Sequence, residues 1–384
     1  MNNFMSNWKK LKKGNAWLFL LISILCINIL IPSKKIFANE VQRKSIISID
    51  AGRKYISVNQ FKKIIDNASD NGYSSVECIL GNDGLRLILD DMSVMLENKV
   101  YSSDDVKKGI IQGNKEYYDD SNGSYLTQSE MDTIIAYAKS KSIEIIPVIN
   151  SPGHMDALLT TMKTLGIKSP NFKTSSRTVD LNNDEAVLFT QNLVSKYVKY
   201  FSEYSKIFNF GFDEYANDVK EGGGWQSLQK TGEYKKFIQY ANTMSKIAKQ
   251  YNMSPMAFND GIYYNNQTKF GLFDKDIIVS YWTSGWKGYN VASAEYLAKS
   301  GHKILNTNDS WYWVIGRMNS SDGYYNFQQA LNGIKQNNFS QVSGSKGKIP
   351  IIGSMICIWA DEPQKTLNLD DVFKLTSEFM KLNR

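Results

Sequence analysis

The sequence contains few cysteines, prolines and histidines. Its 384 residues include 3 Cys, 7 Pro and 2 His. The cysteines (Cys26, Cys78 and Cys357) are far apart, which excludes a disulfide framework and a cysteine-ligated metal site. Because Cys78 and Cys357 each stand in an apolar run, we expect buried thiols rather than a bridge. No His/Asp cluster has metal-ligand spacing, so we expect no metal.

Nucleotide-binding motifs are also missing. No G-x-G-x-x-G or P-loop follows an early strand, and we therefore expect no cofactor of that kind. The composition, 42% hydrophobic and 22% charged, excludes collagen-like and wholly disordered chains.

The excess of positive charge lies in one segment. Residues 1–38 contain six lysines and no acid, and without them the formal charge falls from +7 by six to +1. A nearly neutral chain has no electrostatic reason to bind nucleic acid, so we expect no such partner.

The same segment has the pattern of an export signal. Four lysines between positions 9 and 13 precede an apolar run from Trp17 to Ile31. Ala38 ends a plausible cleavage site. We predict a signal peptide over 1–38, a single domain over 39–384 and a secreted protein. If the segment is not cleaved, it would anchor the chain in a membrane. A lipid attached to Cys26 is disfavoured, because the large Leu25 precedes it.

The rest of the chain alternates short apolar runs with amphipathic stretches. Eight strands are predicted, at 45–50, 75–80, 144–149, 207–211, 254–258, 276–281, 303–306 and 351–358. Apolar residues at helical spacing follow the first and fourth strands, for example at 58, 61, 64, 65 and 68. This alternation predicts a parallel (β/α)8 barrel, with a doubly wound open sheet as the alternative.

In such a barrel the functional residues stand at the carboxyl ends of the strands. Here those ends are rich in carboxylates, amides and indoles, which suit a sugar whose hydroxyls need polar partners and whose C–H faces pack on aromatic rings. The fourth strand ends in Asp213 and Glu214. Neighbouring residues of a strand point to opposite faces, so both reach one pocket only if the chain turns, which Gly211 allows. Two environments could then raise the pKa of one carboxyl and leave the other ionised, as general-acid chemistry requires.

The wider pattern resembles the family 20 glycoside hydrolases, the β-N-acetylhexosaminidases. Asn209 to Glu214 matches the family's His/Asn-x-Gly-x-Asp-Glu motif. Asp50-Ala51-Gly52-Arg53, Pro152-Gly153-His154 and Trp359-Ala360-Asp361 follow in the expected order. The sequence is most similar to the exo-hexosaminidase modules of Gram-positive surface proteins.

The resemblance implies a role for each matching residue. Glu214 would be the general acid/base, Asp213 would support the substrate's acetamido group, and Tyr312 would donate to its carbonyl oxygen. Arg53 and Asp361 would hold sugar hydroxyls. The remaining residues would form the walls of the pocket or tune the acid: Trp282, Trp286, Trp359, His154 and Asp83.

Two departures from the family pattern affect these expectations. Asn150 stands where many relatives have an acid, and Asp361 replaces the commoner Glu, with Glu362 beside it. The implied function is exo-hydrolysis of β-linked N-acetylglucosamine or N-acetylgalactosamine from glycans, with retention through an oxazoline.

Two alternatives stay open. One is a lacto-N-biosidase that releases a disaccharide, and the other is a catalytically inactive carbohydrate-binding barrel, against which the intact Asp213, Glu214 and Tyr312 argue. An endo-chitinase is disfavoured, because the Asp-x-x-Asp-x-Asp-x-Glu strand is absent. The motifs leave the oligomeric state open.

Overall fold

The computed structural model describes residues 43–336 and 349–382. The predicted signal segment therefore lies outside the described residues. None of the described helices is both long and apolar enough to cross a membrane.

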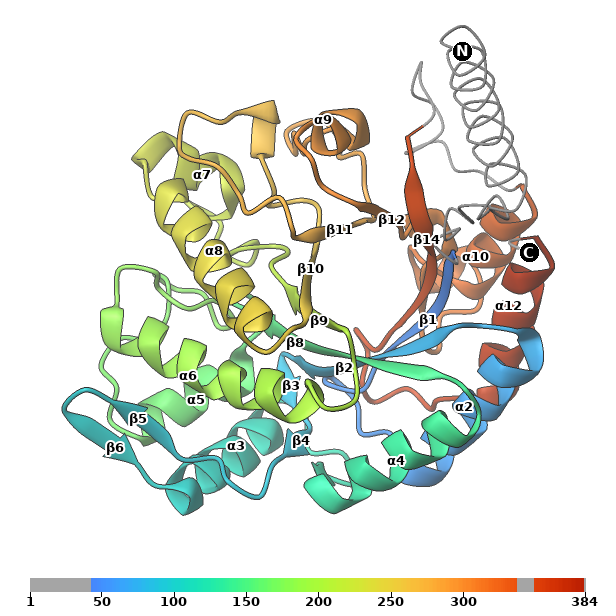
Figure 1. Ribbon diagram of the computed structural model, residues 1–384, viewed down its shortest axis with the longest axis horizontal. Coiled ribbons are helices and arrows are strands. Elements are labelled where there is room, and N and C mark those ends of the chain that lie inside the picture. Colours follow the sequence, from blue (N-terminus) through green and yellow to red (C-terminus); the bar gives the residue numbers. More distant parts are fainter. Residues whose placement is uncertain (1–42, 337–348, 383–384) are drawn as a thin grey trace, which may run out of the picture. The chain divides into compact units, whose positions relative to one another are not determined.

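A closed barrel of eight parallel strands forms the centre of the fold (Figure 1). Its strands are β1 (Lys44–Asp50), β2 (Ser75–Asn82), β8 (Glu144–Ser151), β9 (Ile207–Gly211), β10 (Ser254–Phe258), β11 (Ile278–Tyr281), β12 (Ile304–Asn306) and β14 (Ile351–Trp359). Strand β1 pairs in parallel with both β14 and β2, which closes the sheet. The predicted barrel is confirmed, and the open sheet is excluded.

Helices surround the barrel on the outside (Figure 1). They are α2 (Val58–Asn71), α3 (Ser103–Tyr117), α4 (Gln128–Ser140), α5 (Asp156–Thr164), α6 (Asp184–Phe201), α7 (Gly224–Thr231), α8 (Tyr234–Gln250), α9 (Ala294–Lys299), α10 (Phe327–Lys335) and α12 (Leu369–Leu382). Helix α2 illustrates how the sequence sets the boundaries. Ser57 and Gln60 form a capping box at its start, and Gly72 ends it at φ 80°. Its buried face is the one predicted from the spacing, with Phe61, Ile64, Ile65 and Ala68 against the barrel.

The connection from β10 to β11 departs from this pattern. It contains only the 3₁₀ turn η1 (Tyr264–Asn266) instead of a helix. Other short elements decorate the barrel: β3 (Gly84–Leu85), β4 (Leu87–Ile88), β5 (Val94–Leu96), β6 (Lys99–Tyr101), β7 (Leu126–Thr127), η2 (Asp309–Trp311), β13 (Trp313–Val314) and η3 (Ser320–Asp322).

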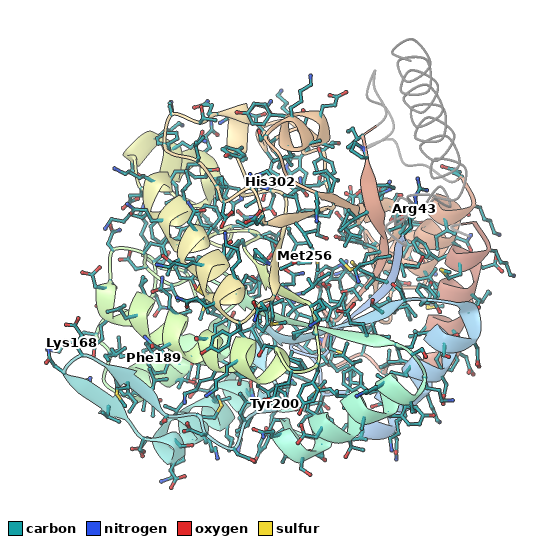
Figure 2. All side chains as sticks on the ribbon, in the orientation of Figure 1. Arg43, Lys168, Phe189, Tyr200, Met256 and His302 are labelled. Atoms are coloured by element: carbon teal, nitrogen blue, oxygen red, sulfur yellow. The ribbon has the colours of Figure 1, made fainter. Side chains whose placement is uncertain are left out.

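Apolar side chains fill much of the barrel interior, among them Met256, which Figure 2 labels near the centre. The interior also holds a buried polar group. Glu77 accepts from Ser48 Oγ at 2.7 Å and from Asn209 Nδ2 at 3.0 Å. Burial raises the pKa of Glu77 to about 7. Cys78 and Cys357 are free, buried thiols, as predicted.

Candidate active site

A pocket of about 270 Å³ opens at the carboxyl ends of the barrel strands. It is lined by Arg53, His154, Asp213, Glu214, Phe258, Trp282, Trp286, Tyr312, Tyr325, Trp359 and Asp361. Nine of the ten residues singled out from the sequence therefore meet at one pocket. The tenth, Asp83, lies behind it and bonds to Arg53 and His154.

A left-handed turn brings both carboxylates of the fourth strand into this pocket. Gly211, Phe212 and Glu214 have φ values of 73°, 64° and 50°. A Cβ on Gly211 would collide with the Asn150 side-chain amide, so only glycine fits there. Asn209 Oδ1 accepts from the Gly211 N–H at 2.9 Å, and the Glu214 N–H donates to Asp260 Oδ2 at 2.9 Å. Positive φ at two non-glycine residues is strain that the surrounding bonds must maintain.

A histidine links the buried acid Asp83 to Glu214. His154 Nδ1 lies 3.1 Å from Asp83 Oδ1, and Nε2 lies 3.4 Å from Glu214 Oε2. Burial disfavours a charged ring, but the carboxylates of Asp83 and Asp213 outweigh it and hold the pKa of His154 well above its usual value. His154 Nδ1 thus faces both Asp83 and the Arg53 Nη2 group, which lies 3.1 Å away, and Nε2 faces Glu214.

The two catalytic candidates have pKa values in the opposite order to the one their implied roles require. Burial raises the pKa of Asp213 to about 6, with the charges of Asp260 and Glu214 adding to the effect and His154 opposing it. Burial also acts on Glu214, but hydrogen bonding and charge from His154 outweigh it and lower its pKa. The Asp213 side chain is 12% exposed and that of Glu214 is 36% exposed. The pKa of Glu214 is thus lowered, while that of its neighbour Asp213 is raised.

Arg53 is buried among acids rather than solvated. Its Nε donates to Asp83 at 2.7 Å, and its Nη1 donates to Asp50 at 3.1 Å and to Asp361 at 3.0 Å. The guanidinium carbon also lies 6.0 Å from the centre of the Trp359 ring. This fork-shaped side chain is held at the pocket floor by three carboxylates.

Aromatic rings form the walls. Trp282 and Tyr312 stack at 6.2 Å with an angle of 15°, and Tyr312 meets Trp359 edge-on at 5.5 Å. The Tyr312 hydroxyl is buried and has no hydrogen-bond partner among the described residues. An unpaired buried hydroxyl is costly unless something else binds it, so it identifies a place where a ligand oxygen fits.

Both departures from the family pattern have structural counterparts. Asn150 Nδ2 donates to Asp213 Oδ1 at 2.7 Å, so the amide supports the charge of Asp213. Asp361 faces the pocket, whereas Glu362 pairs with Arg317 at 2.7 Å and does not line it. Of these two carboxylates, Asp361 is therefore the one that a ligand in the pocket can reach.

Three residues at or behind the pocket were not singled out as site residues from the sequence. Phe258 and Tyr325 line it, and Asp260 lies behind Glu214. Phe258 and Asp260 stand at the end of a predicted strand, which is the available signal for both. Tyr325 comes from the turn before α10 and has φ 57°, which no pattern in the sequence indicates. Across the ranges 43–336 and 349–382, no three His, Cys, Asp or Glu side chains are grouped to hold a metal ion.

Comparisons with known proteins identify the family. Residues 46–373 match the model for the glycosyl hydrolase family 20 catalytic domain. A solved structure of the pneumococcal exo-β-D-N-acetylglucosaminidase StrH, which has tandem catalytic modules of this family, is 48% identical with a TM-score of 0.86. The match covers 89% of this chain and 83% of that one.

Two curated proteins are more distant. Lacto-N-biosidase from Bifidobacterium bifidum is 25% identical over 62% of this chain and 21% of its own length. β-Hexosaminidase subunit A2 from Dictyostelium discoideum is 22% identical over 73% of this chain and 46% of its own length. The chain thus spans about a fifth and about half of these relatives. The family match over most of the chain is decisive, and the chain belongs to glycosyl hydrolase family 20.

Proposed function

We propose that this protein is a retaining exo-β-N-acetylglucosaminidase that uses the substrate's own acetamide as the nucleophile. The observation that supports this most directly is the unpartnered Tyr312 hydroxyl, which lines the same pocket as Asp213 and Glu214. An acetamido carbonyl needs a donor such as this hydroxyl, and its N–H needs an acceptor such as Asp213. The StrH relative is itself described as an exo-β-D-N-acetylglucosaminidase.

The pocket size fits a single terminal sugar. At about 270 Å³ it lies below the range of roughly 300–1,000 Å³ that holds drug-sized ligands. Trp359 provides an apolar face, and Arg53 with Asp361 provides donors and an acceptor for hydroxyls.

In the first step, the acetamido oxygen attacks C1 while Glu214 protonates the departing oxygen. Tyr312 and Asp213 orient the acetamide, and the charge of Asp213 stabilises the positive oxazolinium ion that forms. Asp213 must be ionised for this purpose, and the bond from Asn150 favours that form.

Glu214 must carry a proton before this step, and His154 can supply it. The imidazolium Nε2 lies 3.4 Å from Glu214 Oε2. A bound sugar displaces water from the partly exposed Glu214, and desolvation raises the pKa of a carboxyl. Proton transfer from His154 to Glu214 on binding would therefore prepare the acid. In the second step Glu214 returns as the base that activates water, and the anomeric configuration is retained.

Hydrolysis of aryl glycosides tests the activity. The purified protein should cleave p-nitrophenyl β-N-acetylglucosaminide, and parallel assays with the β-N-acetylgalactosaminide and with a lacto-N-biose glycoside distinguish the related specificities. The 25% identity to lacto-N-biosidase is the reason to include the disaccharide. Cleavage of none would favour a carbohydrate-binding barrel without activity.

Fluorinated substrates test the nucleophile. Successive fluorine atoms on the acetamido methyl withdraw electrons from the carbonyl oxygen, so the rate should fall steeply with each one. A flat series, together with covalent labelling of Asp213, would indicate an enzyme nucleophile instead.

We also propose that the protein is exported by its first 38 residues. The support is the basic and apolar pattern of that segment. N-terminal sequencing of protein recovered from the culture medium should begin after Ala38. Recovery only in membranes with the full-length mass would contradict cleavage.

A further inference from the structure

One buried carboxylate outside the pocket contacts both of its sides. Asp260 directly follows β10 and is fully buried. Its Oδ1 accepts from Trp282 Nε1 at 3.1 Å. Its Oδ2 accepts from the Glu214 N–H at 2.9 Å, from Trp225 Nε1 at 2.9 Å and from the Tyr289 hydroxyl at 2.6 Å.

Each of these donors belongs to a different part of the pocket or its support. The Glu214 N–H belongs to the turn that carries the proposed acid. Trp282 is a wall of the pocket, and Tyr289 stacks beneath Trp286 at 4.4 Å with an angle of 16°. Trp225 packs at 4.5 Å against Phe237 of α8 and so connects the group to the outer layer. One side chain thus joins the segments that follow β9, β10 and β11.

The bonding pattern requires a carboxylate rather than another polar group. All four partners are donors, and none of them is a cation. An amide of the same shape would turn an NH₂ group toward at least one donor, and that bond would be lost. The charge of Asp260 also contributes to the raised pKa of the neighbouring Asp213.

We propose that Asp260 is a positioning residue that fixes the Glu214 turn and the Trp282 and Trp286 walls relative to one another. This inference rests on the proposed function. Because Glu214 and Phe212 adopt left-handed φ values, the turn needs an external bond to stay in place, and the Asp260 carboxylate supplies it at the backbone of Glu214 itself.

The first test is Asp260→Ala, which removes both oxygens, with Tyr234→Phe as a matched control. An asparagine could turn its NH₂ group toward Trp282 and keep the bond to the Glu214 N–H. Tyr234 donates to the Gly261 carbonyl at 2.6 Å, so it supports the same segment without bonding to Asp260. We expect D260A to lower kcat about 10²-fold, the cost of a small misplacement of a reacting group, and to raise KM as well. Y234F should leave both close to wild type.

Hydrogen exchange of peptides covering residues 212–216 gives a readout that is independent of activity. In D260A the Glu214 amide should exchange much faster than in wild type, whereas in Y234F it should not. Unchanged exchange in folded D260A would overturn the inference. If the wild-type protein hydrolysed no glycoside, the proposed function would fail, and the exchange result would still decide whether Asp260 holds the turn.

A second variant keeps the test valid if D260A does not fold. Tyr289→Phe removes the hydroxyl that bonds to Asp260 and leaves the ring beneath Trp286 in place. KM should rise several-fold while kcat stays within about twofold, because the Glu214 N–H bond is retained. Equal kinetics for Y289F and Y234F would contradict a role for Asp260 on the Trp286 side.

Discussion

Removal of the Arg53 side chain tests how the pocket floor is stabilised. Arg53→Ala takes away the cation that contacts Asp50, Asp83 and Asp361. Two of these acids are buried, with side chains 0% and 2% exposed, whereas Asp361 is 42% exposed and can be solvated by water. If Arg53 holds sugar hydroxyls, as the family resemblance implies, binding and turnover should fall in this variant. From the structure we also expect the substitution to lower the free energy of unfolding.

The size of that cost follows from the partners that remain. Leaving a buried charge unpaired costs about 3–5 kcal/mol. Asp50 keeps bonds from Asn82 and three backbone N–H groups, and Asp83 keeps His154, so we expect the lower end of the range. Dividing about 3–5 kcal/mol by an unfolding entropy of roughly 2.1 cal/mol/K per residue gives a fall in Tm of about 4–7 °C for a domain of this size.

The pH dependence of this loss identifies its origin. Burial raises the pKa of Asp83, but Arg53 and His154 outweigh it and hold the pKa well below its usual value. A depressed carboxyl pKa contributes stability above the unfolded-state pKa of about 3.9, and the contribution disappears as the pH falls through the folded-state value. In R53A the pKa of Asp83 rises and the acid protonates earlier. The Tm difference from wild type should therefore be largest near neutral pH and shrink toward pH 4.

Thermal unfolding between pH 4 and 8 measures this, with glycoside kinetics on the same samples. Arg317→Ala is the control, because it removes a partly exposed ion pair with Glu362 outside the pocket. A Tm difference in R53A that does not depend on pH would refute the electrostatic explanation. Wild-type kinetics would refute a role for Arg53 in sugar binding.

Three further substitutions test the roles within the pocket. Glu214→Gln should abolish hydrolysis of glycosides with poor leaving groups but spare part of the activity on activated aryl glycosides, because protonation matters most for basic leaving groups. Equal losses on both kinds of substrate would count against Glu214 as the acid. Asp213→Asn should slow hydrolysis of both kinds of glycoside by about 10²–10³-fold. Because the pKa of Asp213 is about 6, wild-type activity should rise with pH through that value, and the variant should not show this rise. Tyr312→Phe should lower kcat with little change in Tm, because no nitrogen or oxygen of the described residues bonds to its hydroxyl and the neighbouring Cys357 thiol is only a weak acceptor. A large fall in Tm would show that the hydroxyl has a structural role.

Strand ends could be predicted from the sequence because the barrel itself brings them together. The predicted strands at 75–80 and 351–358 correspond to β2 and β14, each with one or two further residues. Once parallel strands close, Arg53, Glu214 and Asp361 must meet at one rim, although 308 positions separate the first from the last.

The electrostatics and supporting contacts could not be predicted in this way. The pKa order of Asp213 and Glu214 depends on a histidine 3.4 Å away and on unequal burial, which sequence spacing does not encode. Asp260 was recognisable as a strand-end acid, but its four donors come from the segments that follow β9 and β11. Tyr325 reaches the pocket from a turn whose conformation is set by packing.

Successive side chains of the segment Trp311-Tyr312-Trp313 point in turn to the helix layer, to the pocket and again to the helix layer. Trp311 packs on Phe379 of α12 at 5.0 Å, Trp313 packs on Phe327 of α10 at 5.4 Å, and Tyr312 between them faces the pocket. Insertion or deletion of one residue here would move an indole into the sugar site and the phenol into the helix layer. Among functional members of this lineage, the segment should therefore tolerate changes of side chain more readily than any change of length.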